Sequence, residues 1–552
     1  MNGKAPHSLA VVRGRLADLA TSLALPLIAA AVAGVSLVHM LVRPQWGDQT
    51  WLLFLARRSL DAGQMQFSDF VEVNSPLIIW LSAIPVGLSQ VFTISSTAAL
   101  QLVMAFIVAC SATWTVSLVG RNEGLTGRIF SIWFALALLF ATVIRPWVHY
   151  AQREHILLLS VLPYLAMSAR RIDGLKLTAS EALLAGVFCA VGILLKPHHA
   201  GIVGAVELFI LAKHRSIRTL VRPETVAMAI TVATYAGAIW LWDSDYLRKV
   251  LPLTLHTYYG YHRVEFWTVL SPMRALKFTA LLLAWALLYR WLAHRTLSTV
   301  LALAAVGATI GCLVQMKGHD YHYVPAIAFF DLLLAVIVID GWLRWFPPRT
   351  WAPRTSVTAA IVIVTSIVTI AISYPLQRTV AAHSYVDERI AAQQSVSREI
   401  PRGSTVVVLS TSTESIFEQV LDRGWEWGSR FDCLWMVPAI VDAERSAARN
   451  GQMEPATVRD AARTTRSAVT ADLERWRPNP VFVDRCQDRS IVPCLGAGGM
   501  RIDLLRWLRE DPGFASAWED TGQNMDNFAF FTNTMCRYFQ NTCQKNDISV
   551  VF

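Results

Sequence analysis

The chain has 552 residues, of which 54% are hydrophobic and only 16% are charged, and its mean hydropathy is +0.41. This composition excludes an ordinary soluble globular protein and is typical of a polytopic membrane protein. The formal net charge of +9 does not require a nucleic-acid partner, because membrane proteins retain lysine and arginine in their cytoplasmic loops.

Apolar runs recur along the first 375 residues. The first run, residues 19–41, is long enough to cross a hydrocarbon core of ~30 Å at a rise of ~1.5 Å per residue. The pattern predicts a mainly α-helical, polytopic domain of residues 1–375 with about eleven spans. The predicted spans are residues 19–41, 96–119, 129–147, 155–169, 179–195, 199–212, 225–242, 275–291, 297–316, 324–343 and 356–375.

Lysine and arginine gather in every second loop between these runs. Because short cytoplasmic loops retain such cations, the alternation predicts a cytoplasmic N-terminus. It places residues 376–552 on the periplasmic or extracellular face of a bacterial-type inner (plasma) membrane. The basic segments that agree on this orientation are Arg13 and Arg15, Arg121 and Arg128, Arg170 and Arg171, Lys213 to Arg222, Arg290 and Arg295, and Arg344 to Arg354.

The first outer loop contains two further predicted helices. Residues 49–61 alternate apolar and polar side chains in a pattern typical of a short amphipathic helix lying in the membrane interface, and Gly63 is expected to end it. Residues 76–92 are apolar but are interrupted by Pro85 and Gly87. A full span here would invert every later basic loop, so we expect an interfacial or re-entrant helix.

The tail, residues 376–552, has ordinary polar composition and predicts one extracytoplasmic domain. Residues 404–410 and 480–484 have the short, β-branched pattern of buried strands. Helical patterns cover about residues 456–476 and 500–510. A small α/β domain is the expected fold.

Five cysteines lie in this tail, where thiols are oxidised if the predicted orientation holds. Cys486 and Cys494, and likewise Cys536 and Cys543, are close enough in sequence to close small disulfide loops, which leaves Cys433 over. The sequence allows cross-pairing among the four equally well, so the pairing stays open.

With this topology, polar residues that interrupt the apolar runs collect on the outer side. Ionisable groups at membrane level are costly, so their default interpretation is a functional site. The group consists of Asp48, Asp69, Glu72 and Asn74, then Arg145, His149, Tyr150, Gln152, Arg153, Glu154 and His155, then Lys196, His198 and His199, and finally Lys317, His319, Asp320, Tyr321, His322 and Tyr323.

Six of the charged members also have a structural interpretation. Asp48 is well placed to cap the helix that starts near Gln49. Asp69 and Glu72 can be interpreted as ordinary solvated loop charges. Arg153 and Glu154 can be interpreted as a structural ion pair. Lys196 stands at the end of a span, where lysine often snorkels to the interface.

The histidines at 198, 199, 319 and 322 are more often interfacial hydrogen-bonding residues than ligands. A set of tyrosines and a tryptophan in a later outer loop suits either stacking on a sugar or prenyl chain or an interfacial aromatic belt. These are Tyr258, Tyr259, Tyr261 and Trp267. The shared sidedness of the polar residues, not any single residue, favours a functional site.

The first outer loop resembles that of a known superfamily. Gly47-Asp48-Gln49, an amphipathic helix, Gly63 and then the stretch Phe67 to Leu77, which contains Asp69, Glu72 and Asn74-Ser75-Pro76, are similar to the first luminal loop of C-type glycosyltransferases. The likeness is closest to protein O-mannosyltransferases and to the aminoarabinose transferases of lipid A. Those enzymes have an acidic pair where this chain has Asp48-Gln49, and a Pro-Pro element where it has Ser75-Pro76.

The resemblance implies transfer of one sugar, with inversion, from a polyprenyl-phosphate donor to a cell-envelope glycan, lipid or protein on the outer face of the membrane. It implies catalytic roles for Asp48, Asp69 and Glu72, with Asp48 as the base that deprotonates the acceptor hydroxyl. The requirement for a divalent metal stays open. The cations expected to bind the donor phosphate are Arg145, Arg153, Lys196 and Lys317, and the residues expected to complete the site are Asn74, Glu154, His155, His198, His319, Asp320 and His322.

A transporter or flippase of lipid-linked sugars is the alternative. Its ionisable residues are expected near the bilayer midplane on broken helices, whereas here they stand at the outer ends of spans, which favours an enzyme. A sensor or scaffold anchored by the membrane half is a third class, but an anchor needs neither so many spans nor a polar cluster on one side.

Overall fold

The apolar runs between residues 96 and 343 are helical in a computed structural model of the chain. The structure describes residues 47–63, 69–120, 125–146, 149–258, 265–345, 398, 400–411, 416–453, 455–479, 481–484, 502–516 and 548–551. The predicted spans 19–41 and 356–375, the boundary at residue 375 and the cysteines at 486, 494, 536 and 543 lie outside these ranges.

Nine predicted spans fall on described residues, and each coincides with a helix. Their bounds are α4 (Ser96–Gly120), α5 (Leu125–Leu139) continued by the π-helix η1 (Phe140–Ile144), α6 (Arg153–Ile172), α7 (Ala179–Leu195), α8 (Gly201–His214), α9 (Pro223–Trp242), α12 (Pro272–Leu288), α13 (Arg295–Gln315) and α14 (Val324–Trp345).

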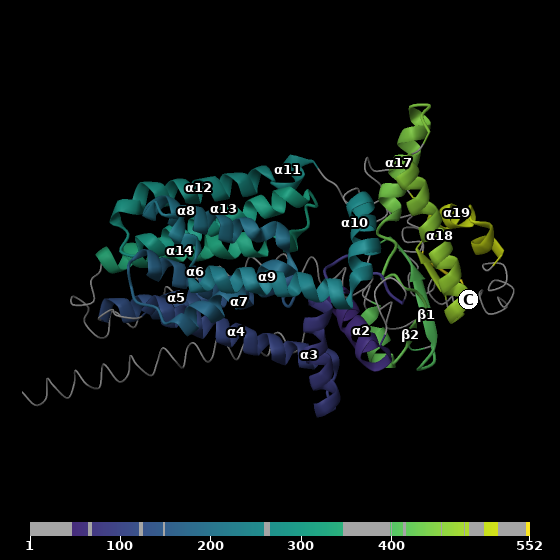
Figure 1. Cartoon of the computed structure of the whole chain (residues 1–552), viewed down its shortest axis with the longest axis horizontal. Helices are drawn as coiled ribbons and strands as arrows, with labels where there is room; N and C mark the ends of the chain where they lie inside the picture. Colours follow the sequence, from purple (N-terminus) through teal and green to yellow (C-terminus); the bar gives the residue numbers. More distant parts are fainter. Residues whose placement is uncertain are drawn as a thin grey trace, which may run out of the picture.

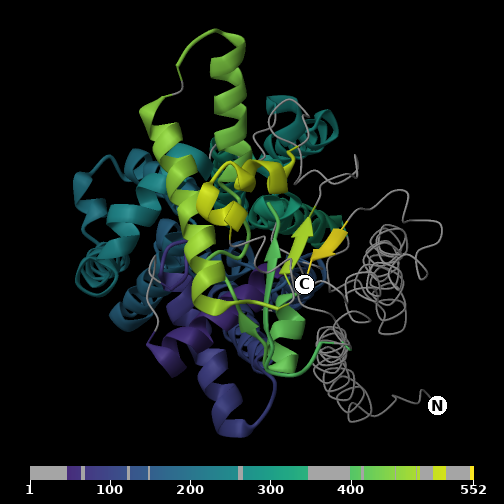
Figure 2. The same cartoon turned by 90° about the vertical axis from the view of Figure 1, so that its right-hand side faces the viewer.

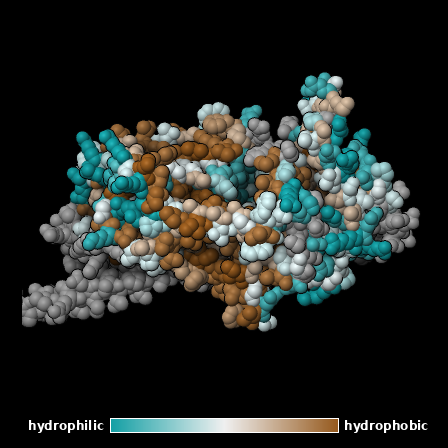
Figure 3. All heavy atoms as spheres, in the orientation of Figure 1, coloured by the Kyte–Doolittle hydropathy of each residue, from teal (hydrophilic) through white to brown (hydrophobic). Residues whose placement is uncertain are grey.

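These helices form an elongated bundle whose middle is apolar. In the described part of the chain, five helices are long and apolar enough to cross a membrane, and three shorter helices are also apolar. Leu102, Phe106 and Ile230 are among the large apolar side chains exposed on the outside of the bundle. Figure 3 shows this hydrophobic zone between two polar ends. The membrane character expected from composition is confirmed at this level, and the count of eleven spans stays a prediction.

The short elements that connect the helices gather at the two ends of the bundle. One end of the bundle lies near the α/β unit, which is formed by the described residues from 400 to 551. The connecting elements at this end are η3 (Pro197–Ala200), η5 (Tyr246–Val250), α10 (Leu251–Thr257), α11 (Phe266–Val269) and η8 (Asp320–Tyr323). At the opposite end lie η4 (Ile217–Leu220) and η7 (Tyr289–Trp291). The predicted polar residues therefore share one end, and the basic loops that contain η4 and η7 share the other.

Helices α2 (Gly47–Ala62) and α3 (Leu77–Phe92) lie where the bundle meets the α/β unit (Figure 1). α3 runs across the bundle axis, as expected for a helix that does not span the membrane. The helix predicted over 49–61 is present and ends just before Gly63, and its expected place in the membrane interface stays a prediction. Residues 51–56 are all buried, because α2 packs between the bundle and the α/β unit.

The α/β unit contains a four-stranded sheet in the order β2-β1-β3-β4. β1 pairs in parallel with β2 and β3, and β3 pairs antiparallel with β4. The two predicted strands are confirmed as β1 and β3, and the two predicted helices as α18 and α19. The bounds are β1 (Thr405–Leu409), α16 (Phe417–Arg423), β2 (Glu426–Trp427), α17 (Val437–Arg449), α18 (Ala456–Trp476), β3 (Val481–Asp484), α19 (Leu504–Arg509) and β4 (Ile548–Val551).

The α/β unit covers the end of the bundle that carries the polar residues. α10 contacts α17 and α18, and α2 contacts α16. Figure 2 shows the unit facing the viewer with the bundle behind it. Cys433 is buried within this unit.

Local sequence explains the position of the turn between the C-terminal end of α7 and the N-terminal end of α8. A capping box between Thr178 and Glu181 starts α7, and the helix ends at Leu195, with Lys196 as its C-cap just before Pro197. Farther on, a side chain at Gly307 would collide with the backbone at Gly201, so two glycines let α8 and α13 approach closely. This contact brings the turn at 197–200 beside α13.

Candidate functional site

The first outer loop and the start of α6 meet in an ion pair. Arg153 Nη2 donates to Asp48 Oδ2 at 3.2 Å. The Asp48 side chain is 26% exposed and that of Arg153 is 8% exposed. Asp48 lies in the first turn of α2, which begins at Gly47. Its carboxylate therefore faces another segment of the chain instead of acting only within its own helix.

A second ion pair lies directly behind the first. Lys196 Nζ is 3.0 Å from Glu154 Oε1, and both side chains are buried. His322 Nε2 approaches the same oxygen at 3.8 Å. The expected structural pair between Arg153 and Glu154 is wrong, because each has a different nearest partner. The snorkelling interpretation of Lys196 is also wrong, since its ammonium points to a buried carboxylate.

The turn before α6 is held rigidly. Ala151 has a left-handed backbone conformation with φ 65°, which is uncommon for a residue with a Cβ. Gln49 Nε2 donates to the Tyr150 carbonyl at 2.5 Å, and the Ala151 N–H donates to His155 Nδ1 at 3.1 Å. His155 Nε2 lies 2.6 Å from the Thr142 carbonyl. His155 thus has both ring nitrogens engaged in supporting the turn, and its expected place in the site stays an untested prediction.

Four histidines cluster next to the buried ion pair. The ring centroids of His198 and His199 are 4.6 Å apart, those of His198 and His322 are 6.4 Å apart, and those of His319 and His322 are 5.6 Å apart. Gln315 Nε2 lies 3.1 Å from His198 Nδ1. Burial lowers the pKa of His198 to about 2. Burial also lowers the pKa of His319, so these imidazoles are neutral at neutral pH.

Lys317 joins the site from the turn after α13. Its ammonium donates to the Tyr258 carbonyl and lies 3.9 Å from the centroid of the Tyr258 ring. Burial lowers the pKa of Lys317 to about 7. The Tyr258 ring also makes an edge contact with Trp435 of the α/β unit, at 5.8 Å between centroids. Trp267, in the same outer loop as Tyr258, is exposed, and Tyr259 and Tyr261 lie outside the described residues.

Glu72 is buried and fully engaged by its neighbours. Its Oε2 accepts a hydrogen bond from Trp51 Nε1 at 2.7 Å, and its Oε1 accepts from the Asn74 N–H at 2.8 Å and from the Asn74 side-chain amide. Asp69 pairs with Arg475 of α18 at 2.9 Å. The interpretation of both carboxylates as solvated loop charges is therefore wrong. Their contacts support the position of the loop, and their catalytic roles stay untested predictions.

Two other expected members have partners in different helices. Arg145 Nε lies 3.2 Å from Asp331 of α14. Asp320 pairs with Arg274 of α12, whose guanidinium also lies 4.4 Å from the centroid of the Tyr323 ring. Asp331 was missed in the sequence, although an acidic residue inside an apolar run is a recognisable signal. Arg274 carried no such signal, because it stands at the start of its helix.

The carboxylates of the site do not assemble as a metal-binding set. In the part of the chain that the structure describes, no group of three or more histidine, cysteine, aspartate or glutamate residues is placed to hold a metal ion. Asp48 and Glu154 each face a cation, and Glu72 binds amide and indole N–H groups. These residues do not fit a divalent metal.

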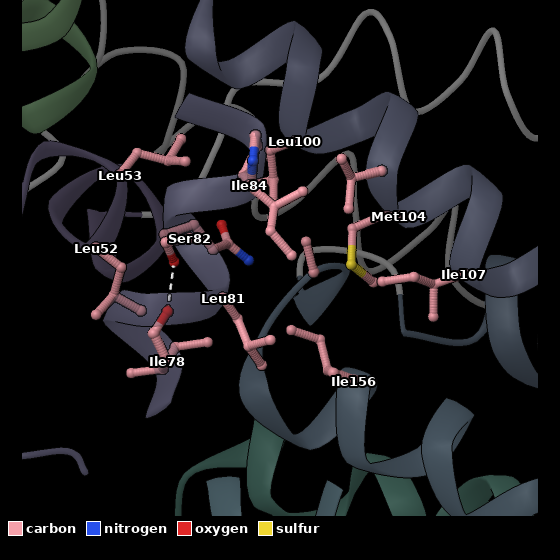
Figure 4. A pocket seen from close by; sticks show the side chains of 14 residues that line it. Leu52, Leu53, Ile78, Leu81, Ser82, Ile84, Leu100, Met104, Ile107 and Ile156 are labelled. Carbon is pink, nitrogen blue, oxygen red and sulfur yellow. Dashed lines mark hydrogen bonds between the residues drawn. The ribbon is translucent and has the colours of Figure 1, made fainter. Parts of the chain in front are cut away.

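An apolar pocket is lined by residues that are close in sequence to Asp48 and Arg153 (Figure 4). It lies between α2, α3 and α4, and Gln49 and Ala151, each within two residues of a member of the pair, line it as well. Ser82 in its wall donates to the Ile78 carbonyl at 2.7 Å, so this polar group is satisfied within α3. The other lining side chains are Leu52, Leu53, Ile78, Leu81, Ile84, Pro85, Leu100, Val103, Met104, Ile107 and Ile156.

Comparison with known proteins finds no family model that matches the chain and no matching curated protein. Among solved structures, the chain is similar to the archaeal oligosaccharyltransferase AglB from Archaeoglobus fulgidus, determined in complex with an inhibitory peptide and a dolichol-phosphate. The identity is 12%, the match covers 87% of this chain and 72% of that chain, and the TM-score is 0.43. A likeness at this level assigns neither a family nor an activity to the chain.

Proposed function

We propose that the chain is a membrane glycosyltransferase of the C-type superfamily. It moves one sugar from a polyprenyl-phosphate donor to a cell-envelope glycan, lipid or protein at the membrane surface that carries the α/β unit. The observation that supports this proposal most strongly is the Asp48–Arg153 pair: of the central carboxylates Asp48, Glu72 and Glu154, only Asp48 has a partly exposed side chain.

The chemistry requires a base that can reach the acceptor. Asp48 accepts the proton of the acceptor hydroxyl while the oxygen attacks the anomeric carbon of the sugar. The bond between that carbon and the phosphate oxygen breaks, and the electron pair leaves with the polyprenyl phosphate. One direct displacement inverts the anomeric centre and needs no covalent intermediate.

The leaving phosphate needs positive charge within the same site, on the side of the anomeric carbon opposite the attacking hydroxyl. Arg153 stands next to Asp48, and Lys196 and Lys317 enter from the ends of α7 and α13. Cations fixed in a buried environment stabilise developing negative charge better than they do in water. Arg145 pairs with Asp331 and not with a carboxylate near Asp48, so we assign it to the outer edge of the donor site.

The apolar pocket supports a lipid carrier. A polyprenyl phosphate has a charged head and an apolar tail, and the site offers charged and apolar surfaces side by side. A divalent metal is not part of this proposal, because the described side chains do not form a ligand set.

A transporter or flippase stays the second candidate. The ion pairs of the site stand at the beginning or end of α2, α6 and α7, which supports a surface reaction more than a midplane translocation site.

The test is mass spectrometry of lipid-linked sugars and envelope glycans in cells that carry the wild-type chain or the Asp48→Asn variant. For an enzyme, the variant loses one sugar modification and accumulates the polyprenyl-phosphate sugar. Unchanged glycans and lipids in the variant would contradict the proposal.

A further inference from the structure

Segment 429–431 of the α/β unit is attached to α18 by one buried carboxylate. Asp472 accepts hydrogen bonds from Arg430 Nε at 2.9 Å and from the Arg430 backbone N–H at 2.8 Å. The Arg430 Nη2 lies 2.8 Å from the same carboxylate, and Ser429 Oγ donates to it at 3.3 Å. A carboxylate that binds both the guanidinium and the backbone of one residue fixes that stretch of chain.

This segment in turn holds the first outer loop. Val71 donates its backbone N–H to the Arg430 carbonyl at 2.6 Å and forms an isolated parallel β-bridge with Phe431. The Phe431 carbonyl also accepts from Trp427 Nε1 at 2.7 Å. Both Val71 and Phe431 are buried. The loop is therefore joined to the α/β unit through its backbone.

The loop reaches Asp48 through Glu72 and Trp51. Glu72 follows Val71 directly and accepts a hydrogen bond from Trp51 Nε1 at 2.7 Å. Trp51 lies three residues after Asp48, so both stand on one face of α2. The Trp51 ring also contacts Phe417 of α16, with 4.7 Å between centroids. Two routes from the α/β unit thus converge on the first turns of α2.

We propose that Asp472 is a positioning residue for Asp48, so that the α/β unit sets the geometry of the Asp48–Arg153 pair. Asp472 acts through Arg430, Val71, Glu72 and Trp51 and does not itself touch substrate. The kinetic consequence rests on the proposed glycosyl transfer, whereas the mechanical coupling does not. Because coupling between sites is reciprocal, a change at Glu72 must also be felt at segment 429–431.

The test is hydrogen exchange measured by mass spectrometry on the full chain in lipid nanodiscs. In Asp472→Asn, we expect amide exchange in residues 69–74 and 47–52 to rise about tenfold, the scale of one lost charge-assisted hydrogen bond. Residues 295–315 of α13 serve as an internal reference and stay unchanged. Asp460→Asn is the matched control, because Asp460 lies on the same helix in an exposed pair with Arg463.

The reciprocal variant, Glu72→Gln, is expected to raise exchange in residues 429–431. In a transfer assay, Asp472→Asn is expected to lower kcat about tenfold with little change in KM for the donor, since the base is displaced while the phosphate-binding cations stay in place. Asp472→Glu, which keeps the charge, should recover part of the loss.

Unchanged exchange at 47–52 in a folded Asp472→Asn protein would overturn the coupling. So would an equal rise in Asp460→Asn or across α13. If Asp472→Asn does not fold, amide exchange at residues 47–52 is measured in Arg430→Gln and compared with Asp460→Asn and with α13 in the same way. If the wild-type chain transfers no sugar, the proposed function fails, while the exchange result still decides the coupling.

Discussion

Asp48 and Arg153 lie 3.2 Å apart although 105 residues separate them in the chain. Their pairing joins the start of α2 to the start of α6. The carboxylate is partly exposed, whereas the guanidinium is buried behind it. A hydroxyl can approach such a carboxylate while the cation remains held by the protein, which supports the proposed role of Asp48 as a base.

The buried pair of Glu154 and Lys196 predicts a large effect on stability. Glu154→Gln leaves a buried ammonium without its counter-ion, and the expected loss is ~3–5 kcal/mol of unfolding free energy. Thermal unfolding in detergent measures it. Asp245→Asn is the control, because Asp245 and Lys249 form an exposed pair worth at most ~1 kcal/mol. The double variant Glu154→Gln/Lys196→Met should regain much of the loss, and equal shifts in Glu154→Gln and the control would argue against a buried pair.

Lys317 predicts a pH dependence of donor binding. Burial lowers its pKa to about 7, so the ammonium is charged below that pH and neutral above it. The KM for the polyprenyl-phosphate sugar should therefore rise as pH increases from about 6 to 8, by up to tenfold per unit above the pKa.

Lys317→Arg should flatten this profile, because a guanidinium stays protonated throughout the range. Lys176→Arg, in an exposed loop at the other end of the bundle, should leave the profile unchanged. A wild-type KM that does not vary with pH would remove Lys317 from the donor site.

Topology can be tested without an activity assay. Single cysteines replacing Arg402 of the α/β unit and Arg218 of a basic loop stand on exposed residues at opposite ends of the protein. A membrane-impermeant thiol reagent applied from outside should label the first and not the second. Labelling of the residue-218 cysteine alone would reverse the predicted orientation.

The helices of the bundle could be predicted because hydropathy along a single segment determines them. The common location of the polar residues followed from loop charges in the same way. By contrast, the partners of the charged residues could not be predicted. Asp69 pairs with Arg475, 406 residues later, and no local pattern encodes a contact between the first loop and the α/β unit.

The burial of α2 could not be predicted from the sequence either. Its mixed apolar and charged pattern suits a helix at a membrane interface as well as one between two protein surfaces. The buried Arg58, which donates to the Trp427 carbonyl at 3.1 Å, shows why: a charged residue in a helix signals solvent only when no partner from a distant segment covers it. The burial of Glu72 could not be predicted either, because its partner Trp51 lies 21 residues earlier in the chain.

Asp48 is the proposed catalytic base. Asp48→Asn keeps the size and most hydrogen bonding of the side chain but removes its charge. Sugar transfer from a polyprenyl-phosphate donor should fall ~10²-fold or more in this variant, the scale of lost base catalysis, while the protein still folds. Asp61→Asn, in an exposed pair with Arg57 near the end of the same helix, should transfer at the wild-type rate. Near wild-type transfer by Asp48→Asn would contradict the assignment.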